Sequence, residues 1–159
     1  MNIFQNEHLD ILKILKKNSV NFLLIGGVAV NYYGFNRPTG DLDVWLEPSE
    51  QNKQMLINAL YELKIFEDDI LKIGGCNFSD SLVFHIGTKP PFVIDFLTKI
   101  VGVTWVEAWN MKVTTELEGI EIAFIHINHL KINKLLAGRP KDLEDISQLN
   151  RIELLRKKS

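Results

Sequence analysis

Two aspartates separated by a single residue stand where a polar loop meets an apolar strand, in the segment FNRPTGDLDVWL, residues 35–46. Side chains alternate between the two faces of a strand, so Asp41 and Asp43 project from one face and Leu42 from the other. Two carboxylates held this close repel each other unless a cation or a proton lies between them. Oxygen ligands suit Mg²⁺ or Mn²⁺. The pair therefore predicts a divalent-metal site, although Asp41 alone also fits a turn residue after Gly40.

A third acid, Asp95, interrupts the apolar run FVIDFL, residues 92–97. An aspartate in such a run is costly to bury unless another group compensates its charge. If its strand is a neighbour of the strand that carries Asp43, three carboxylates converge on one site. The sequence alone leaves the order of the strands open.

Gly26 and Gly27 follow the apolar run NFLLI, residues 21–25, and precede a predicted helix. Because glycine has no Cβ, a phosphate group can approach the backbone N–H groups closely there, and a helix N-terminus favours an anion. A tight turn without a ligand is the alternative interpretation. The sequence contains neither a P-loop nor the dinucleotide-binding fingerprint.

Basic residues that could neutralise a bound phosphate occur in two places. Arg37 lies in the loop before the aspartates, and Lys134 lies on a predicted C-terminal helix. Lys134 is the candidate for contact with the β and γ phosphates of a nucleotide, and an ordinary surface lysine is the alternative. Asp142 and Asp145 either complement a helix N-terminus or orient Lys134 or Arg139.

The apolar spacing predicts a mixed α/β domain, with elements in the order helix, strand, helix, strand, helix, strands and helices. The first expected helix covers residues 7–17, the second begins at Val28, and the third follows the N-cap Ser49. A fourth covers residues 128–137, with Gly138 just beyond its end. A fifth begins at Pro140 and is expected to turn Leu143, Ile146 and Leu149 inward. The expected strands are 21–25, 41–46, 81–87, 90–98 and a hairpin between Met111 and Ile125 that turns at Glu118-Gly119.

The length of 159 residues suits a single domain over residues 1–159, with a core over about 20–126 and C-terminal helices over about 127–159. No apolar run approaches the roughly 18 residues of a membrane helix, and the N-terminus does not resemble a signal peptide, so we expect no membrane partner. Cys76 is the only cysteine, which excludes an internal disulfide and fits the reducing cytoplasm.

The net charge of −2 is unevenly distributed. Residues 1–130 hold 10 basic and 16 acidic side chains, and residues 131–159 hold 8 basic and 4 acidic ones. The basic C-terminal segment permits an anionic ligand nearby. The excess is too weak to predict binding of duplex nucleic acid.

The segment LLIGGVAVNYYGFNRPTGDLDVWL, residues 23–46, resembles the signature of the nucleotidyltransferase superfamily related to DNA polymerase β: a hydrophobic strand, a Gly-Gly pair, about a dozen residues and Asp-x-Asp. The C-terminal segment KINKLLAGRPKDLEDI, residues 131–146, is similar to the tail of compact bacterial members grouped with abortive-infection toxin nucleotidyltransferases. The resemblance covers about residues 20–150. It implies a mixed β-sheet with helices packed against it and a short C-terminal helical segment.

The resemblance also implies an activity, namely transfer of a nucleoside monophosphate from a nucleoside triphosphate to an acceptor hydroxyl by two-metal (Mg²⁺) catalysis, with release of pyrophosphate. Gly26 and Gly27 would border the triphosphate, Asp41 and Asp43 would hold the metals, and Asp95 would bind one metal and help to deprotonate the acceptor. The acceptor could be a tRNA end, a protein hydroxyl or a small molecule. A partner protein or a second copy of the chain is also compatible with the pattern.

Other enzyme classes that use Asp-x-Asp fit less well. Phosphatases of the haloacid-dehalogenase type have small residues and a threonine after the motif, where this chain has Val44, Trp45 and Leu46. Glycosyltransferases with this motif are usually much larger. The alternative from a different class is a nucleotidyltransferase fold that serves as a non-catalytic binding module, such as an antitoxin or a regulatory partner.

Overall fold

The computed structural model describes residue 4 and residues 6–87 and 93–158. In chain order its elements are α1 (Asn6–Lys17), β1 (Phe22–Ile25), α2 (Gly26–Tyr32), β2 (Leu42–Leu46), α3 (Glu50–Glu62), α4 (Glu67–Gly74), β3 (Val83–Ile86), β4 (Ile94–Leu97), α5 (Trp105–Met111), β5 (Val113–Leu117), β6 (Ile120–Phe124), α6 (Ile127–Ala137) and α7 (Pro140–Lys157). No helix in the described ranges is long and apolar enough to cross a membrane.

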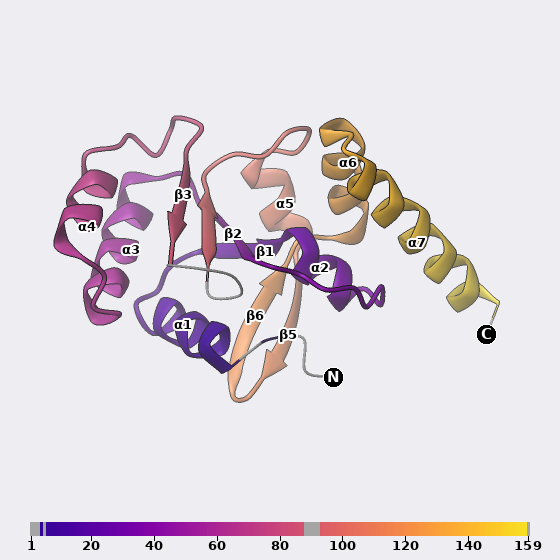
Figure 1. Cartoon of the computed structure of the whole chain (residues 1–159), viewed down its shortest axis with the longest axis horizontal. Coiled ribbons are helices and arrows are strands. Elements are labelled where there is room, and N and C mark those ends of the chain that lie inside the picture. Colours follow the sequence, from indigo (N-terminus) through magenta and orange to yellow (C-terminus); the bar gives the residue numbers. More distant parts are fainter. Residues whose placement is uncertain (1–3, 5, 88–92, 159) are drawn as a thin grey trace.

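The strands form one mixed sheet in the order β3-β4-β2-β1-β6-β5 (Figure 1). β2 runs antiparallel to β1 and parallel to β4, and β1 runs parallel to β6. This topology places the end of β1 beside the starts of β2 and β4. Residues that follow β1 therefore meet residues near the starts of the other two strands.

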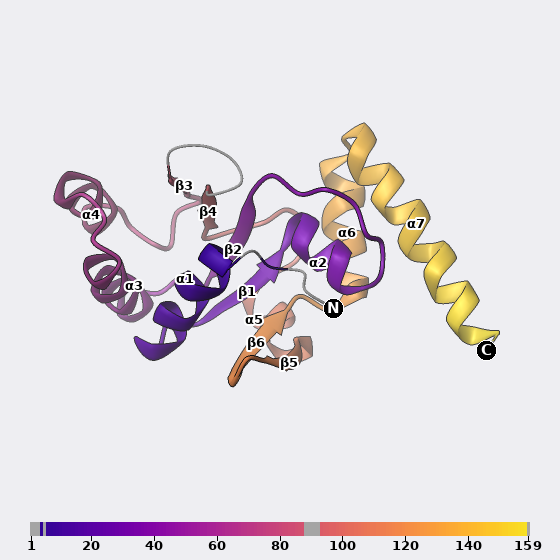
Figure 2. The same ribbon diagram turned by 60° about the horizontal axis from the view of Figure 1, so that its bottom comes forward.

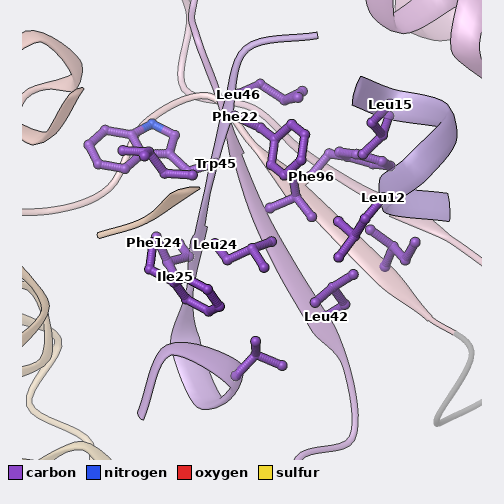
Figure 3. Packing of buried hydrophobic residues seen from close by; sticks show 14 of the residues in the cluster. Leu12, Leu15, Phe22, Leu24, Ile25, Leu42, Trp45, Leu46, Phe96 and Phe124 are labelled. Carbon is purple, nitrogen blue, oxygen red and sulfur yellow. The ribbon is translucent and has the colours of Figure 1, made fainter. Parts of the chain in front are cut away.

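The two faces of β2 carry different side chains. Leu42, Val44 and Leu46 are fully buried on one face, and burial of each such side chain stabilises the fold by about 1.5–3 kcal/mol. Figure 3 shows Leu12 and Leu15 of α1 on the side of these leucines, with Trp45 pointing the opposite way. The ring of Trp45 meets that of Trp105 in α5, with centroids 5.3 Å apart. Asp43 shares the Trp45 face, because the two residues are two positions apart in the strand.

The helix that begins at Pro140 extends away from the sheet toward the C-terminus (Figures 1 and 2). Its buried residues are Asp142, Asp145 and Leu149. The expectation that Leu143 points inward is wrong, since 48% of this residue is exposed. The two aspartates occupy the inward positions of the first turns, where they form ion pairs with Arg37, Lys134 and Arg139, and Leu143 therefore faces solvent.

Several local predictions are confirmed. The side chain of Ser49 accepts a hydrogen bond from the backbone N–H of Asn52 at the start of α3. Gly138 ends α6 with φ 68°, and the hairpin turns at Glu118 and Gly119, which both have positive φ. Side-chain capping and the conformational freedom of glycine account for these boundaries.

Other boundaries differ from the predictions. α2 begins at Gly26 instead of Val28, and α4 and α5 were not anticipated. Both unanticipated helices are short, so they carry little of the periodicity that identifies a helix. The strand expected over 90–98 is observed as Ile94–Leu97, and the part of that prediction over 90–92 lies outside the described residues.

Candidate active site

The structure brings the three predicted carboxylates together. β2 and β4 are neighbours, and Asp43 lies directly opposite Asp95 in their parallel register. Adjacent strands lie about 4.8 Å apart, so the backbones of these two residues are in contact range. Asp41 immediately precedes β2, and all three acids line a pocket of about 630 Å³. The condition for convergence, neighbouring strands, is therefore met.

The pocket makes the charge on Asp43 unfavourable. Burial, which is the largest cause, and the negative charges of Asp95 and Asp41 together raise the pKa of Asp43 from 3.8 to about 6, although the charges of Lys134 and Lys141 act in the opposite direction. The two lysines thus leave the Asp43 carboxylate with too little compensating positive charge. A cation in the pocket would supply it.

The side chains nevertheless do not form a closed metal cage. Among the described residues, no three His, Cys, Asp or Glu side chains are grouped so that they could hold a metal ion. The carboxylate of Asp95 contacts His85, with Asp95 Oδ1 2.5 Å from His85 Nδ1. The donor set itself, three carboxylates around one pocket, has the chemistry that Mg²⁺ or Mn²⁺ requires.

The glycine pair is required by close contacts with the aspartate-bearing segment. Gly26 has φ +65°, and a Cβ on it would collide with the Asp43 carboxylate, with the carboxyl carbon only 2.9 Å away. A Cβ on Gly27 would lie 2.5 Å from the Thr39 side chain. Both glycines line the pocket. The bare backbone thus lets the end of β1 approach the start of β2.

The predicted cations also line the pocket, where two buried aspartates hold them. Arg37 makes a bidentate ion pair with Asp145, with N–O distances of 2.7 and 2.8 Å. Lys134 is only 4% exposed, and its Nζ lies 2.8 Å from Asp145 and 3.2 Å from Asp142. Asp142 also accepts a hydrogen bond from Arg139 Nε at 2.7 Å. These contacts form one continuous network from Arg37 to Arg139.

The pKa values of Asp142 and Asp145 agree with this network of ion pairs. Burial alone would raise the pKa of Asp142 and Asp145, but hydrogen bonds from Arg139 and Arg37 and the charge of Lys134 hold both pKa values below the usual range. Asp142 additionally accepts a hydrogen bond from the backbone N–H of Arg139 at the start of α7. Asp142 therefore makes both kinds of contact that the sequence suggested, one with the N-terminus of α7 and one with the side chains of Lys134 and Arg139. Asp145 contacts Arg37 and Lys134.

Sequence reasoning missed several residues that line the pocket, among them Thr39, Lys99 and Asn133. Lys99 could have been predicted, because every second side chain of a strand lies on the same face and Lys99 follows Asp95 and Leu97 in that series. Thr39 belongs to the Arg-x-Thr-x-Asp-Leu-Asp pattern of residues 37–43 that resembles the family, although the pattern assigns it no role. Asn133 has no comparable signal, because its place in the pocket depends on how α6 packs against the sheet.

Comparison with known proteins agrees with this architecture. The family model described as nucleotidyl transferase of unknown function (DUF2204) matches residues 5–158. Among solved structures, the chain is similar to the lincosamide antibiotic adenylyltransferase LnuA with lincomycin bound, with 16% identity, a TM-score of 0.58, and coverage of 96% of this chain and 99% of that chain.

A second solved structure is an antigenic nucleotidyltransferase-like protein from Paracoccidioides brasiliensis, with 16% identity, a TM-score of 0.49, and coverage of 90% of this chain and 74% of that chain. No curated protein sequence matches the chain significantly. The likeness to LnuA shows the fold, and the expectation of a nucleotidyltransferase-like mixed α/β fold is confirmed.

Proposed function

Because the chain belongs to the family of nucleotidyl transferases of unknown function (DUF2204), we propose that it transfers a nucleoside monophosphate from a nucleoside triphosphate to an acceptor hydroxyl and releases pyrophosphate. The observation that carries this proposal is the register of Asp43 against Asp95 in one pocket with Asp41, Gly26 and Gly27.

Asp41, Asp43 and Asp95 are the residues that would hold Mg²⁺ or Mn²⁺. The raised pKa of Asp43 supports this assignment, because a bound cation would offset both the burial and the neighbouring negative charges that raise it. When bound, the metal ions would supply positive charge to the attacking and leaving oxygens of an in-line displacement.

The cationic wall of the pocket is proposed to bind the triphosphate. Arg37, Lys134 and Arg139 are held in place by Asp142 and Asp145, so their orientation is set before a ligand arrives. Fixed positive groups are worth most where charge develops during phosphoryl transfer, because no reorganisation is needed. Three cations against two carboxylates leave one net positive charge in this network.

Lys141 adds a second source of positive charge. It lines the pocket near the start of α7 and makes no ion pair with another residue in the described ranges. Lys134, in contrast, is engaged with two aspartates and its side chain is only 5% exposed, whereas the side chains of Arg37 and Arg139 are 24% and 60% exposed. We therefore assign the direct contact with the β and γ phosphates to Lys141 together with Arg37 and Arg139, with Lys134 as the buried charge that supports them.

Asp95 is proposed to accept the proton of the acceptor hydroxyl. A general base must lie within hydrogen-bond reach of that proton. Asp95 lines the pocket beside Asp43, so an acceptor oxygen that approaches the α-phosphate there also approaches the Asp95 carboxylate.

The presence of all three acids in one pocket favours catalysis over a non-catalytic binding module. A module that only binds a partner has no need for a buried carboxylate beside two others, an arrangement that raises the pKa of Asp43. The alternative would gain support from a protein that binds nucleotide without turnover.

The test is to incubate the purified protein with Mg²⁺, an α-labelled nucleoside triphosphate and separate RNA, protein and small-molecule fractions of a cell extract. Covalent label in one fraction is the expected result, and that fraction identifies the acceptor class. The Asp43→Asn variant is the matched control, in which we expect no label. Absence of label in every fraction with all four nucleotides would contradict the proposal.

A further inference from the structure

His85 and Asp95 form an ion-pair-like contact beside the pocket that none of the roles above uses. His85 lies on β3, the edge strand, directly opposite Asp95 in the antiparallel register of β3 and β4. Its Nδ1 lies 2.5 Å from Asp95 Oδ1. The side chain of Asp95 is 17% exposed and that of His85 is 69% exposed. Asp95 therefore lies between the pocket and a histidine on the outer edge of the sheet.

We propose that His85 is a positioning residue for Asp95, an inference that rests on the proposed function. Nδ1–H of the imidazole donates a hydrogen bond to Oδ1 and fixes the rotation of the carboxylate about its Cβ–Cγ bond. Oδ2 is then left to face the pocket. A carboxylate held by one hydrogen bond loses less freedom when it engages a cation or an acceptor proton, because its orientation is already set.

Asp95 contacts a histidine, whereas the other paired acids near the pocket contact lysine and arginine. Asp142 and Asp145 are paired with lysine and arginine, whose full charges hold the pKa of both acids low. A carboxylate neutralised in that way is a poor base. The imidazole of His85 contacts only one oxygen of Asp95, Oδ1, so the second carboxylate oxygen stays available for a cation or for the acceptor proton.

The position of His85 agrees with this role rather than with a packing role. Residues of β3 alternate between exposed Val83 and His85 and half-buried Phe84 and Ile86. The apolar pair faces the core, where Phe84 lies 6.0 Å from Phe78 between ring centroids. Removal of the His85 side chain therefore leaves the core intact and removes only the contact with Asp95.

The opposite role would be withdrawal, in which His85 keeps Asp95 away from the pocket. The two roles predict opposite effects of the same substitution. If His85 orients Asp95 for use, loss of the imidazole weakens binding of the cation. If His85 withdraws Asp95, loss of the imidazole strengthens it.

The experiment measures the affinity for Mn²⁺, by electron paramagnetic resonance, in the presence of a non-hydrolysable nucleoside triphosphate analogue. For His85→Ala we expect affinity reduced by about 10–100-fold, the usual effect of removing a group that orients a ligand. His85→Asn should recover most of the affinity, because the amide Nδ2–H can donate from nearly the position of Nδ1. Val83→Ala, on the same strand and face, is the control and should match the wild type.

A second readout does not depend on nucleotide or metal. In the wild type, ¹⁵N chemical shifts should report a proton on Nδ1 of His85, and Asp95→Ala should shift the imidazole toward the tautomer that carries its proton on Nε2. Unchanged or tighter Mn²⁺ binding in His85→Ala, or an unprotonated Nδ1 in the wild type, would overturn the proposal. A wild-type protein that binds no Mn²⁺ with any nucleotide analogue would instead contradict the proposed function itself.

Discussion

Asp43 on β2 lies directly opposite Asp95 on β4, in a parallel pair of strands that both begin at the pocket. Strands far apart in the sequence thus deliver two acids to one place. The nearby lysines, Lys134 and Lys141, do not fully offset these negative charges, so the carboxylates repel each other until a cation binds.

The burial of Asp43 and its repulsion from Asp95 and Asp41 predict that Asp43→Asn stabilises the metal-free protein at neutral pH. Folded Asp43 keeps its proton up to about pH 6, against 3.8 for the ordinary group. The folded state therefore binds more protons than the unfolded state in this window, and the Asp43 contribution to stability is lost as pH rises through it. At about 1.4 kcal/mol per pKa unit the gain at pH 7 is up to roughly 3 kcal/mol.

The measurement is the difference in free energy of unfolding between Asp43→Asn and the wild type, by urea titration with a chelator present. Other acids, such as Asp142 with its lowered pKa, change stability in the opposite direction, but they cancel in this difference. We expect the difference to shrink toward zero near pH 4. A variant less stable than the wild type at pH 7 would contradict the raised pKa.

Gly26→Ala should destabilise the protein by about 1–3 kcal/mol, because the new Cβ collides with the Asp43 carboxylate and Gly26 has a positive φ. Gly40→Ala is the matched control in the neighbouring loop, where a Cβ would meet nothing within 4 Å. Thermal unfolding of both variants is the measurement. Equal midpoints would show that the turn tolerates a side chain.

Lys134→Ala should lower the free energy of unfolding by about 3–5 kcal/mol, because it leaves two buried carboxylates, Asp142 and Asp145, without their shared cation. Lys131 lies on the same helix but pairs with the partly exposed Glu153, so Lys131→Ala should lower the free energy of unfolding by less than about 1 kcal/mol. Denaturant titration compares the two variants. Similar losses for both would mean that the buried network contributes little to stability.

Asp95→Asn should reduce turnover far more than it reduces nucleotide affinity, because acceptance of the acceptor proton matters mainly in the transition state. Single-turnover transfer of α-labelled nucleotide, with nucleotide affinity measured separately, checks this. A loss confined to nucleotide affinity would make Asp95 a binding residue only.

Much of the site could be predicted from sequence because local periodicity sets it. The alternation in LDVWL places Asp43 and Trp45 on one face, and the glycines and Ser49 mark turns and caps that depend on neighbours in the chain. The sequence could place Asp95 beside Asp43 only on the condition that their strands are neighbours, because strand order depends on packing between distant parts of the chain.

The C-terminal helix shows where local reasoning fails. An apolar pattern places Leu143 inward, but the buried positions belong to Asp142 and Asp145. Aspartate becomes a buried residue there only because Arg37, about a hundred positions earlier, and Lys134 meet it. The contact between His85 and Asp95 likewise depends on the pairing of β3 with β4.

The most direct test of the account follows the fate of a nucleoside triphosphate labelled on both the α- and γ-phosphates, with Mg²⁺ and the acceptor fraction present. We expect the α-label to become covalently attached to the acceptor while the γ-label leaves in pyrophosphate, and we expect both events to disappear in Asp43→Asn. Release of the γ-label as orthophosphate, with no α-label on any acceptor, would show hydrolysis instead and contradict the central claim.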